Sequence, residues 1–475
     1  MIDFVIGYAT IILYAVFLIF GVGSIVKKLF NTEISRKIIH IFLFVLRFLI
    51  DVFFKNTVHQ ILIPLFFVFI NFLSYKFSIF KTIERTGDNH PGTVYFAIAV
   101  LMVYTCSYLF SEMYKFTYYG VMALTIGDGT AALFGQTIKS PKIYKKKSLI
   151  GFIACAIFTF LMFLINFFFL DGTLNIYAII VLAVLTAIFE LVDFGLDNFT
   201  ITILIFLLAY LSFLLGDVFV LSLALGILVF LFVFFCKVIT YYGSIVSMFI
   251  VFCFYFFGGL NAFIFLIVCY LVSVICSIIK KIKKTKINVT KKHGKRDAVQ
   301  ILVNGIVPTI LIIIYYIVKI EPLLIISLIG IASNLVDSVS SDIGCLSTKK
   351  PYDLIKRKRV QTGLSGGVSI LGITASLVVS ILCSLMIFFF YNWEWYYIPI
   401  FAILIFVGTL IDSLLGSLIQ KKNICPICGE VTEKEYHCDV KCNYYSGIKY
   451  IDNDGVNFLS SILNILISLV LLVVI

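Results

Sequence analysis

Long apolar runs, separated by short polar segments, fill the chain from its second residue to Ile475. Many of these runs approach the roughly 20 residues that a helix needs to cross the hydrocarbon core of a bilayer. Counting on that criterion predicts about 13 to 16 membrane-spanning helices, because polar residues interrupt several of the runs. The pattern therefore predicts an all-α, polytopic integral membrane bundle.

Composition supports this interpretation. The chain is 61% hydrophobic and 13% charged, with a mean hydropathy of +1.11, which excludes a soluble globule. Residues 2–26 have no basic segment before them and no small-residue cleavage site after them, so we expect a retained span and not a signal peptide. No hydrophilic stretch is long enough for a separate catalytic domain, so any chemistry must use helix ends and loops.

The basic residues gather in a few loops, and the net charge is +12. By the positive-inside rule we expect a multi-pass protein of the cell membrane whose sites face the cytoplasm. Topology signals and contacts with anionic lipids would explain the same residues. Nucleic acid is not an expected partner, because the basic residues are not interleaved with aromatic residues on a soluble domain. The basic loops lie within residues 27–37, 139–147, 280–296 and 349–359.

One pattern occurs twice: an aspartate among small residues in an apolar stretch, a glycine seven positions later, then a proline and a basic cluster. The first copy contains Asp128 and Gly135, and the second contains Asp337 and Gly344. A carboxylate in hydrocarbon is costly unless it meets a cation, water or a metal, and lysines suit phosphate. We therefore expect two related halves, residues 1–212 and 213–475, each with a site for a phosphorylated, metal-bound substrate.

In the first half, Arg36, His40 and Arg47 have the spacing of one helix face. Such a basic face within an apolar helix needs an anionic partner, either the Asp128 region or a bound phosphate. Snorkelling from the helix start is the alternative for Arg36. Residues 84–93 form a polar turn that is either a plain loop or a part of the site.

Further along, Lys147 and Ser148 precede an apolar run. Ser148 can cap a helix there, and the free N–H groups of a helix start favour phosphate. Glu190, Asp193 and Asp197 then have the spacing of one helix face. Mg²⁺ prefers carboxylates together with substrate phosphates. The magnesium candidates of this half are Asp128, Glu190, Asp197 and Asn198.

In order and spacing, these motifs resemble the CTP-dependent polyprenol kinase family, which contains dolichol kinase and phytol kinase. The resemblance covers roughly residues 30–205, and Ile150 departs from it because the family has Glu there. It implies CTP as the phosphate donor, a prenyl alcohol as the acceptor, and Asp128 and Glu190 as catalytic residues. The residues implied in nucleotide or phosphate binding are Arg36, His40, Gly135, Lys147, Ser148 and Gly151.

In the second half, Arg296, Gln300 and Asn304 have the spacing of a polar helix face that enters the membrane. A hydrogen-bonding seam between helices is the alternative for this face. Residues 361–369 form a Gly/Ser-rich loop after a basic cluster. Such a loop presents backbone N–H groups to an anion, although this one matches no Walker pattern.

These segments resemble the phytyl-phosphate kinase family of integral membrane proteins over nearly all of residues 215–475. The resemblance implies phosphorylation of a prenyl phosphate, with Asp337 and Asp412 as catalytic residues. The expected phosphate-binding residues are Lys295, Arg296, Gln300, Asn304, Lys358, Gly363, Gly366 and Gly367. The expected Mg²⁺ ligands are Asp337, Asp342, Asp412, Asp452 and Asn453.

A cluster of cysteines and a histidine occupies the last polar segment, within residues 423–445. The spacing suits a structural zinc ion held by Cys425, Cys428, Cys442 and either His437 or Cys438. Free thiols or a disulfide are the alternatives.

Together, these observations predict a natural fusion of two kinases that act in isoprenoid salvage. The first half would use CTP and Mg²⁺ to phosphorylate a long prenyl alcohol, and the second would convert the monophosphate to the prenyl diphosphate. A cytidylyltransferase that makes a CDP-lipid combines the same elements. A transporter or flippase of a phosphorylated lipid is the non-enzymatic alternative.

Overall fold

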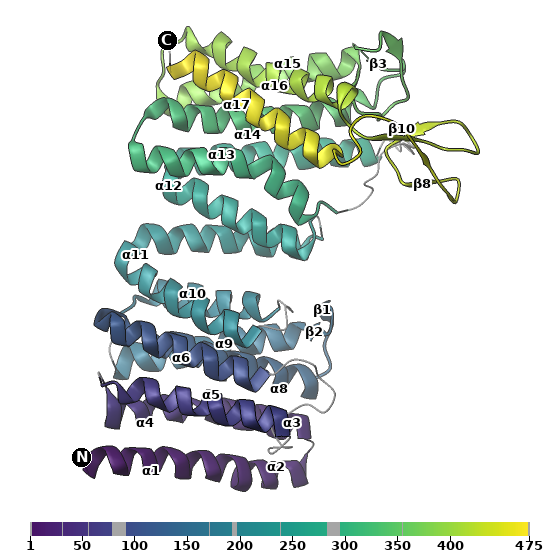
Figure 1. Ribbon diagram of the computed structural model, residues 1–475. Coiled ribbons are helices and arrows are strands. Elements are labelled where there is room, and N and C mark those ends of the chain that lie inside the picture. The colour runs from purple at the N-terminus through teal and green to yellow at the C-terminus, as the bar shows by residue number, and fades with distance from the viewer. Residues whose placement is uncertain are drawn as a thin grey trace. The chain divides into compact units, whose positions relative to one another are not determined.

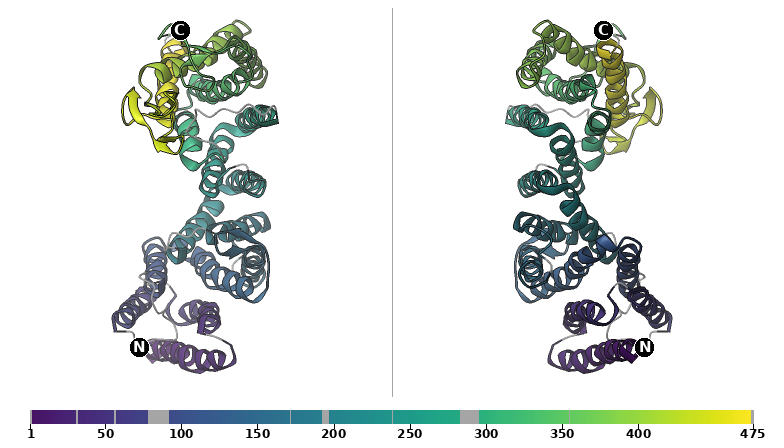
Figure 2. Two further views of the ribbon diagram at one scale, coloured as in Figure 1. Left: turned by 90° about the vertical axis from the view of Figure 1, so that its right-hand side faces the viewer. Right: turned by 90° about the vertical axis from the view of Figure 1, so that its left-hand side faces the viewer.

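The computed structural model describes residues 2–30, 32–55, 57–77, 92–170, 172–191, 197–237, 239–282, 295–353 and 355–473. Within these ranges, 11 helices are long and apolar enough to cross a membrane. This confirms the prediction of a polytopic helical membrane protein. The chain divides into two compact units, residues 1–227 and residues 228–475, which we call unit 1 and unit 2. Within each unit the helices run side by side, as the views along their axes show (Figure 2).

Two of these helices are longer than one crossing requires. They are α11 (Asp197–Phe235) and α12 (Tyr241–Ile282), and each contains one glycine in the left-handed region. Gly216 has a φ of 68° and Gly259 a φ of 78°, values that a side chain would disfavour. At about 1.5 Å per residue, either helix unbroken would be about twice as long as the hydrocarbon core is thick. Each therefore supplies two spans, which brings the described spans to the lower end of the predicted range.

Unit 1 combines helices long enough to span a membrane, such as α5, α6 and α9, with shorter ones such as α7 and α8; several of them are labelled in Figure 1. Ile11, Ile50, Phe54, Tyr104 and Tyr114 belong to one of its buried cores. Before α11, its elements are α1 (Ile2–Val16), η1 (Phe17–Val22), α2 (Gly23–Leu29), α3 (Thr32–Phe42), α4 (Phe44–Phe54), α5 (His59–Phe77), α6 (Gly92–Leu109), η2 (Ser111–Phe116), α7 (Thr117–Met122), η3 (Ala123–Asp128), α8 (Gly129–Thr137), β1 (Lys142–Tyr144), β2 (Lys147–Ser148), α9 (Leu149–Phe169) and α10 (Ile176–Glu190).

Unit 2 surrounds one buried helix, α14 (Glu321–Gly344), in which 78% of the spanning window is covered by protein. Its strands lie together at one end of the helices (Figure 1), in sheets ordered β4-β3-β5, β10-β6-β7 and β8-β9. The other elements after α12 are α13 (Ala298–Val318), β3 (Tyr352–Asp353), β4 (Lys358–Arg359), β5 (Gly367–Val368), α15 (Ile370–Tyr391), α16 (Tyr397–Leu418), β6 (Lys422–Ile424), β7 (Val431–Thr432), β8 (Tyr436–His437), β9 (Val440–Lys441), β10 (Asn443–Ser446) and α17 (Asn453–Val473).

In unit 1, the segment that begins at Asp128 ends in a close contact between α8 and α9. The Ser148 hydroxyl accepts a hydrogen bond from the Gly151 N–H at 3.2 Å and so caps α9, as predicted. A Cβ atom on Gly151 would lie 2.7 Å from the carbonyl oxygen of Ala131. Only glycine fits where the two helices approach so closely.

Unit 2 repeats this arrangement where α14 meets α15. The Ser369 hydroxyl accepts a hydrogen bond from the Gly372 N–H at 3.1 Å. A Cβ atom on Gly372 would lie 3.0 Å from the carbonyl oxygen of Ser340, in the helix that carries Asp337. The repeat seen in the sequence is therefore also a repeat of local structure.

Candidate functional site

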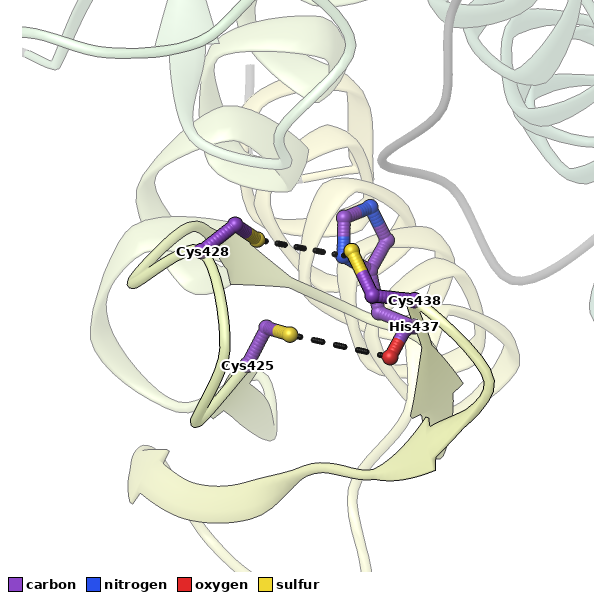
Figure 3. Close-up of side chains that lie close together, drawn as sticks. All are labelled: Cys425, Cys428, His437 and Cys438. Atoms are coloured by element: carbon purple, nitrogen blue, oxygen red, sulfur yellow. Dashed lines mark hydrogen bonds between the residues drawn. The ribbon is translucent and has the colours of Figure 1, made fainter.

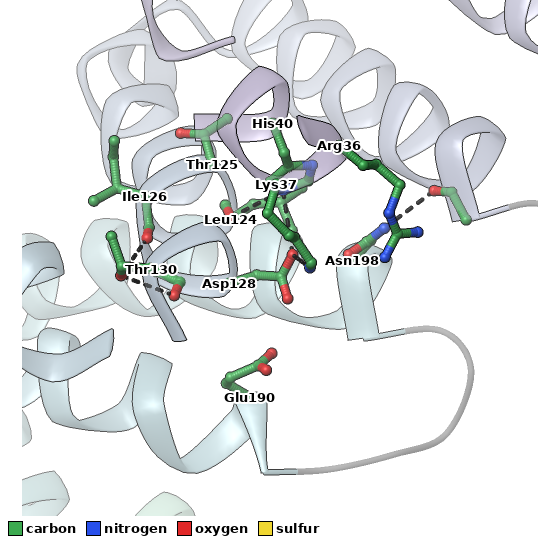
Figure 4. Close-up of polar contacts among 12 residues, drawn as sticks. Arg36, Lys37, His40, Leu124, Thr125, Ile126, Asp128, Thr130, Glu190 and Asn198 are labelled. Carbon is green, nitrogen blue, oxygen red and sulfur yellow. Dashed lines mark hydrogen bonds and ion pairs between the residues drawn. The ribbon is translucent and has the colours of Figure 1, made fainter. Parts of the chain in front are cut away.

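Asp128 is the buried carboxylate at the centre of the candidate site in unit 1. It ends η3, a turn of π-helix, and such turns often occur at functional sites. The Lys37 Nζ on α3 donates to the Asp128 Oδ2 at 2.6 Å. The His40 Nε2 lies 3.4 Å from the same oxygen and 3.2 Å from the carbonyl oxygen of Leu124. Figure 4 shows Lys37 and His40 directed at Asp128 from α3.

The second buried carboxylate of unit 1 also has a lysine partner. Glu190 is the last residue of α10, and its side chain forms an ion pair with Lys147 of β2. Figure 4 places Glu190 on the side of Asp128 away from α3. The site therefore contains two carboxylates and two lysines, and each carboxylate has a cation that belongs to the protein.

The predicted basic face does not extend to Arg47, because the helix is interrupted at Leu43 between α3 and α4. Arg36 and His40 both lie in α3, and His40 contacts Asp128 as predicted. Arg36 pairs with Glu33 at 2.5 Å, one turn earlier in α3. Arg47 is buried and pairs with Asp51 within α4, far along the chain from the Asp128 segment. His40 makes the contact with Asp128 that the basic face was expected to make, and Lys37 adds a contact that the prediction did not include.

The predicted face of Glu190, Asp193 and Asp197 is also wrong. Helix α10 ends at Glu190 and α11 begins at Asp197, so the two residues do not share one helix. Asp193 and residues 84–91 lie outside the described residues. The side-chain amide of Asn198 donates to the Gly92 carbonyl at 3.1 Å, which ties the start of α11 to the start of α6.

Gly135 and Gly151 lie where α8 packs against α9, so the contact between these helices accounts for both glycines. A Cβ atom on Gly135 would lie 3.0 Å from the Ser148 hydroxyl and 3.6 Å from the Gly151 Cα. Their predicted role in phosphate binding stays a prediction.

In unit 2, the predicted residues converge on one cavity of about 650 Å³. Its walls come from the end of α12, the start of α13, the end of α14, the Gly-rich loop, α16 and the start of α17. Lys358 is the exception among the predicted residues, because it is exposed in β4 and does not line the cavity. The predicted residues in the lining are Lys295, Arg296, Gln300, Asn304, Asp337, Asp342, Gly363, Gly366, Gly367, Asp412, Asp452 and Asn453.

Asp337 and Asp412 also line a smaller cavity of about 10 Å³. Asn304, Asn457 and Ser460 complete much of its wall, and the Ser460 hydroxyl donates to the Asp412 Oδ1 at 3.1 Å. Within the described ranges, neither carboxylate forms an ion pair with a lysine, arginine or histidine. Carboxylate and amide oxygens are the ligands of hard divalent cations, so this group has the chemistry of a Mg²⁺ site.

Other charged residues of the cavity have partners within unit 2. Asp342 accepts from the Lys280 Nζ at 2.9 Å and from the Ser277 hydroxyl at 2.6 Å. The Arg296 guanidinium donates to the Ser273 hydroxyl at 2.8 Å, which anchors it at the cavity wall. The predicted metal ligand Asp342 is therefore paired with a lysine.

Gln300 and Asp452, which were predicted to bind ligands, form hydrogen bonds at the starts of two helices that line the cavity. Gln300 forms a capping box with Asp297 at the start of α13. Asp452 accepts from the N–H groups of Asp454 and Gly455 at the start of α17. These two residues shape the cavity by fixing the helix starts that line it.

The hydrogen bonds that Glu433 and Lys422 form with the Gly-rich loop were not predicted from the sequence. The Glu433 Oε1 accepts from the N–H and the hydroxyl of Ser365 at 3.0 and 2.6 Å, and the Lys422 Nζ donates to the Ser365 carbonyl at 2.8 Å. Burial raises the pKa of Glu433 and lowers the pKa of Lys422 to about 8. Both residues lie in the segment after α16, far from the loop in sequence, and no local pattern predicts their contact.

Asp353 stabilises the loop before the Gly-rich segment. Burial would raise its pKa, but hydrogen bonds from the Lys356 N–H and the Ser417 hydroxyl outweigh this and lower it. Asp353 is therefore held as a carboxylate, which connects β3 to the end of α16.

The cysteine and histidine cluster after α16 has formed in part as predicted. Cys425, Cys428, His437 and Cys438 lie together, so the structure includes both of the residues offered as alternatives. Cys442 is outside this group of four, and its thiol lies beside that of Cys425.

Comparison with known proteins identifies relatives of the chain. A family model described as integral membrane protein DUF92 matches residues 223–465, which nearly coincide with unit 2. Protein PGR of Arabidopsis thaliana is 30% identical over 207 residues, which are 38% of this chain and 71% of that protein. An uncharacterized membrane protein of Methanocaldococcus jannaschii is 28% identical over 181 residues, covering 35% of this chain and 73% of the relative. No solved structure matches the chain.

Proposed function

This chain belongs to the integral membrane protein family DUF92, and from that premise we propose that it is a lipid kinase with two sites. Unit 1 transfers a phosphoryl group from CTP to a long prenyl alcohol. Unit 2 transfers a second phosphoryl group from a nucleoside triphosphate to the prenyl monophosphate. The polyprenol kinase and phytyl-phosphate kinase motifs support this assignment, and the basic loops favour sites on the cytoplasmic side.

The observation that carries the proposal is the polar cavity of unit 2. It combines the carboxylates of Asp337 and Asp412, which lack a cationic partner among the described residues, with Lys295, Arg296 and a glycine-rich loop. Phosphoryl transfer needs positioning and charge neutralisation more than covalent help from the protein. A cavity with metal-ligating oxygens on one wall and basic residues on another suits a nucleotide phosphate next to a lipid phosphate.

In the second step, an oxygen of the prenyl monophosphate attacks the γ-phosphorus of the nucleotide. The bond between that phosphorus and the β–γ bridging oxygen breaks, and a nucleoside diphosphate leaves. Asp337 and Asp412 would hold Mg²⁺, which when bound neutralises phosphate charge and orients the phosphates. Lys295 and Arg296 stabilise the negative charge on the transferred group, while the prenyl tail stays in the bilayer.

In the first step, the hydroxyl oxygen of the prenyl alcohol attacks the γ-phosphorus of CTP and the bond between that phosphorus and the β–γ bridging oxygen breaks. CDP leaves, and the hydroxyl proton passes to a carboxylate of the site or to water. Lys37 forms an ion pair with Asp128, and Lys147 forms one with Glu190. With CTP bound, Lys37 and Lys147 would contact its phosphates, and Asp128 and Glu190 would hold Mg²⁺, which would supply further neutralisation of phosphate charge.

The test uses the full chain purified in detergent, supplied with geranylgeraniol, Mg²⁺ and CTP labelled in either the γ-phosphate or the cytosine. The proposal predicts γ-label in a prenyl monophosphate and then in a diphosphate, with cytosine label in CDP. Cytosine label in a lipid, with release of pyrophosphate, would identify a cytidylyltransferase instead. Absence of turnover, combined with lipid phosphate movement across proteoliposomes, would identify a transporter.

A further inference from the structure

Three cysteines and a histidine form a compact group in the loop between α16 and α17. The ligand atoms of Cys425, Cys428, His437 and Cys438 all lie within 4.8 Å of one another. The His437 Nδ1 lies 3.4 Å from the sulfur of Cys428 and 3.4 Å from that of Cys438 (Figure 3). Bonds of about 2.3 Å to sulfur and about 2.0 Å to nitrogen place such ligands about 3.6 Å apart around a tetrahedral zinc ion. The group therefore already has the spacing of a zinc centre.

The outer nitrogen of the histidine has the neighbour that a zinc ligand usually has. The His437 Nε2 faces the Glu430 carboxylate at 3.8 Å. Histidines that bind zinc commonly direct their second ring nitrogen at a carboxylate or carbonyl, which orients the ring and favours the correct tautomer. With Nε2 directed at Glu430, Nδ1 points toward the cysteines.

The segment around this group has almost no hydrophobic core. Between β6 and the end of β10, Cys425 is the one buried residue of the apolar class. The strands of this segment contain only two to four residues each. Small segments that bury so little apolar surface are commonly held together by a metal or by disulfides. All twelve cysteines of the chain have free thiols in this structure, so no disulfide joins the segment, and a metal bound by the four ligands would supply the cross-link.

The segment also supports one wall of the unit 2 cavity. Glu433 accepts two hydrogen bonds from Ser365, and Lys422 donates to the Ser365 carbonyl. Ser365 and Glu433 both line the cavity. Whatever fixes the segment therefore also fixes the position of the Gly-rich loop.

We propose that Cys425, Cys428, His437 and Cys438 bind one Zn²⁺ ion with a structural role. Four protein ligands leave no open coordination position, so the ion does not activate water or substrate. It joins the turn after β6 to the end of β8 and the residue that follows it, and so holds Glu433 and Lys422 against the Gly-rich loop. This inference does not depend on which reaction the cavity supports.

The test measures metal content in the full chain, purified in detergent with a reductant and without added metal. We expect about one zinc per chain in the wild type, and less than about a fifth of that in C428S and H437A. C442S and C236S, which change a nearby and a remote thiol, should retain the zinc. A wild type without bound metal would overturn the site, and zinc lost from C442S but kept by H437A would overturn this set of ligands.

The structural role of the zinc ion can also be tested by limited proteolysis of the wild type, which gives a result even if C428S folds poorly. Removing zinc from the folded wild type with a chelator should increase tryptic cleavage at Lys434 and Lys441 at least tenfold, and added zinc should reverse it. Cleavage in unit 1 provides the internal control and should not change. A tryptic pattern unaffected by zinc removal would contradict the structural role.

Discussion

The carboxylates of the two candidate sites differ in burial and in partners: Asp128 and Glu190 of unit 1 are buried, whereas Asp337 and Asp412 of unit 2 are half-buried. In unit 1, Asp128 pairs with Lys37 and Glu190 pairs with Lys147. In unit 2, Asp337 and Asp412 line a common small cavity without an ion pair among the described residues. In the unit 1 site, each carboxylate is neutralised by a lysine of the protein. In the unit 2 site, two negatively charged carboxylates line the same small cavity.

This difference separates two ways of preparing a site for a metal-bound phosphate. A buried ion pair is stable without a ligand, but the ligand must displace it. Two half-buried carboxylates that line one small cavity repel each other, so a divalent cation stabilises them when it binds. We therefore expect unit 2 to bind Mg²⁺ in the absence of nucleotide, and unit 1 to bind it together with CTP.

The largest expected effect on stability follows from removing a lysine of unit 1. K37M leaves the Asp128 carboxylate buried without its partner, which costs about 3 to 5 kcal/mol in the free energy of unfolding. Unfolding in detergent, followed by helical circular dichroism, measures the loss. K146M changes an exposed lysine near Lys147 and should have almost no effect. If K37M and K146M lowered the free energy of unfolding equally, the ion pair between Lys37 and Asp128 would not contribute to stability, and the prediction would be wrong.

The next effect is stabilisation of unit 2 by magnesium. At a free Mg²⁺ concentration about 100 times its dissociation constant, the bound ion should stabilise the wild type by about 2.7 kcal/mol. D337N and D412N should lose this stabilisation, and D128N should keep it. Without the cation, neither unit 2 substitution should reduce stability, because neither carboxylate has an ion pair to lose. A metal effect that survives in both D337N and D412N would place the ion elsewhere.

The smallest effect tests the repeated contact between helices. S148A and S369A each remove the side-chain cap of a helix, and each should cost about 1 kcal/mol. S24A, in an exposed position of α2, is the control. Similar losses of stability in S148A and S369A would show that the two caps contribute equally to the stability of their units. A loss in only one of the two variants would contradict this.

Much of the unit 2 site could be predicted from the sequence, because its motifs lie at helix ends and helix ends of a membrane bundle meet at one surface. Lys358 was predicted for the site, but it is exposed in β4 and does not line the cavity. The contacts of Ser365 with Glu433 and Lys422 could not be predicted, since tertiary packing alone brings these segments together.

The unit 1 predictions failed where one continuous helix was assumed. Spacing places residues on one face only while the helix continues, and the chain leaves it at Leu43 and again after Glu190. Leu43 lies in an apolar stretch without glycine or proline, so no local signal marks the first break. Lys37 ends one of the basic segments noted in the sequence, but its partner Asp128 is 91 positions away.

The most direct measurement compares the two reactions in D128N and D337N. Each variant is given geranylgeraniol in one assay and geranylgeranyl monophosphate in another, with Mg²⁺ and labelled nucleoside triphosphates. We predict that D128N loses the alcohol step by about 100-fold or more and keeps the monophosphate step, while D337N shows the opposite pattern. Loss of both steps in either variant, with an intact fold, or retention of both, would contradict two separate sites.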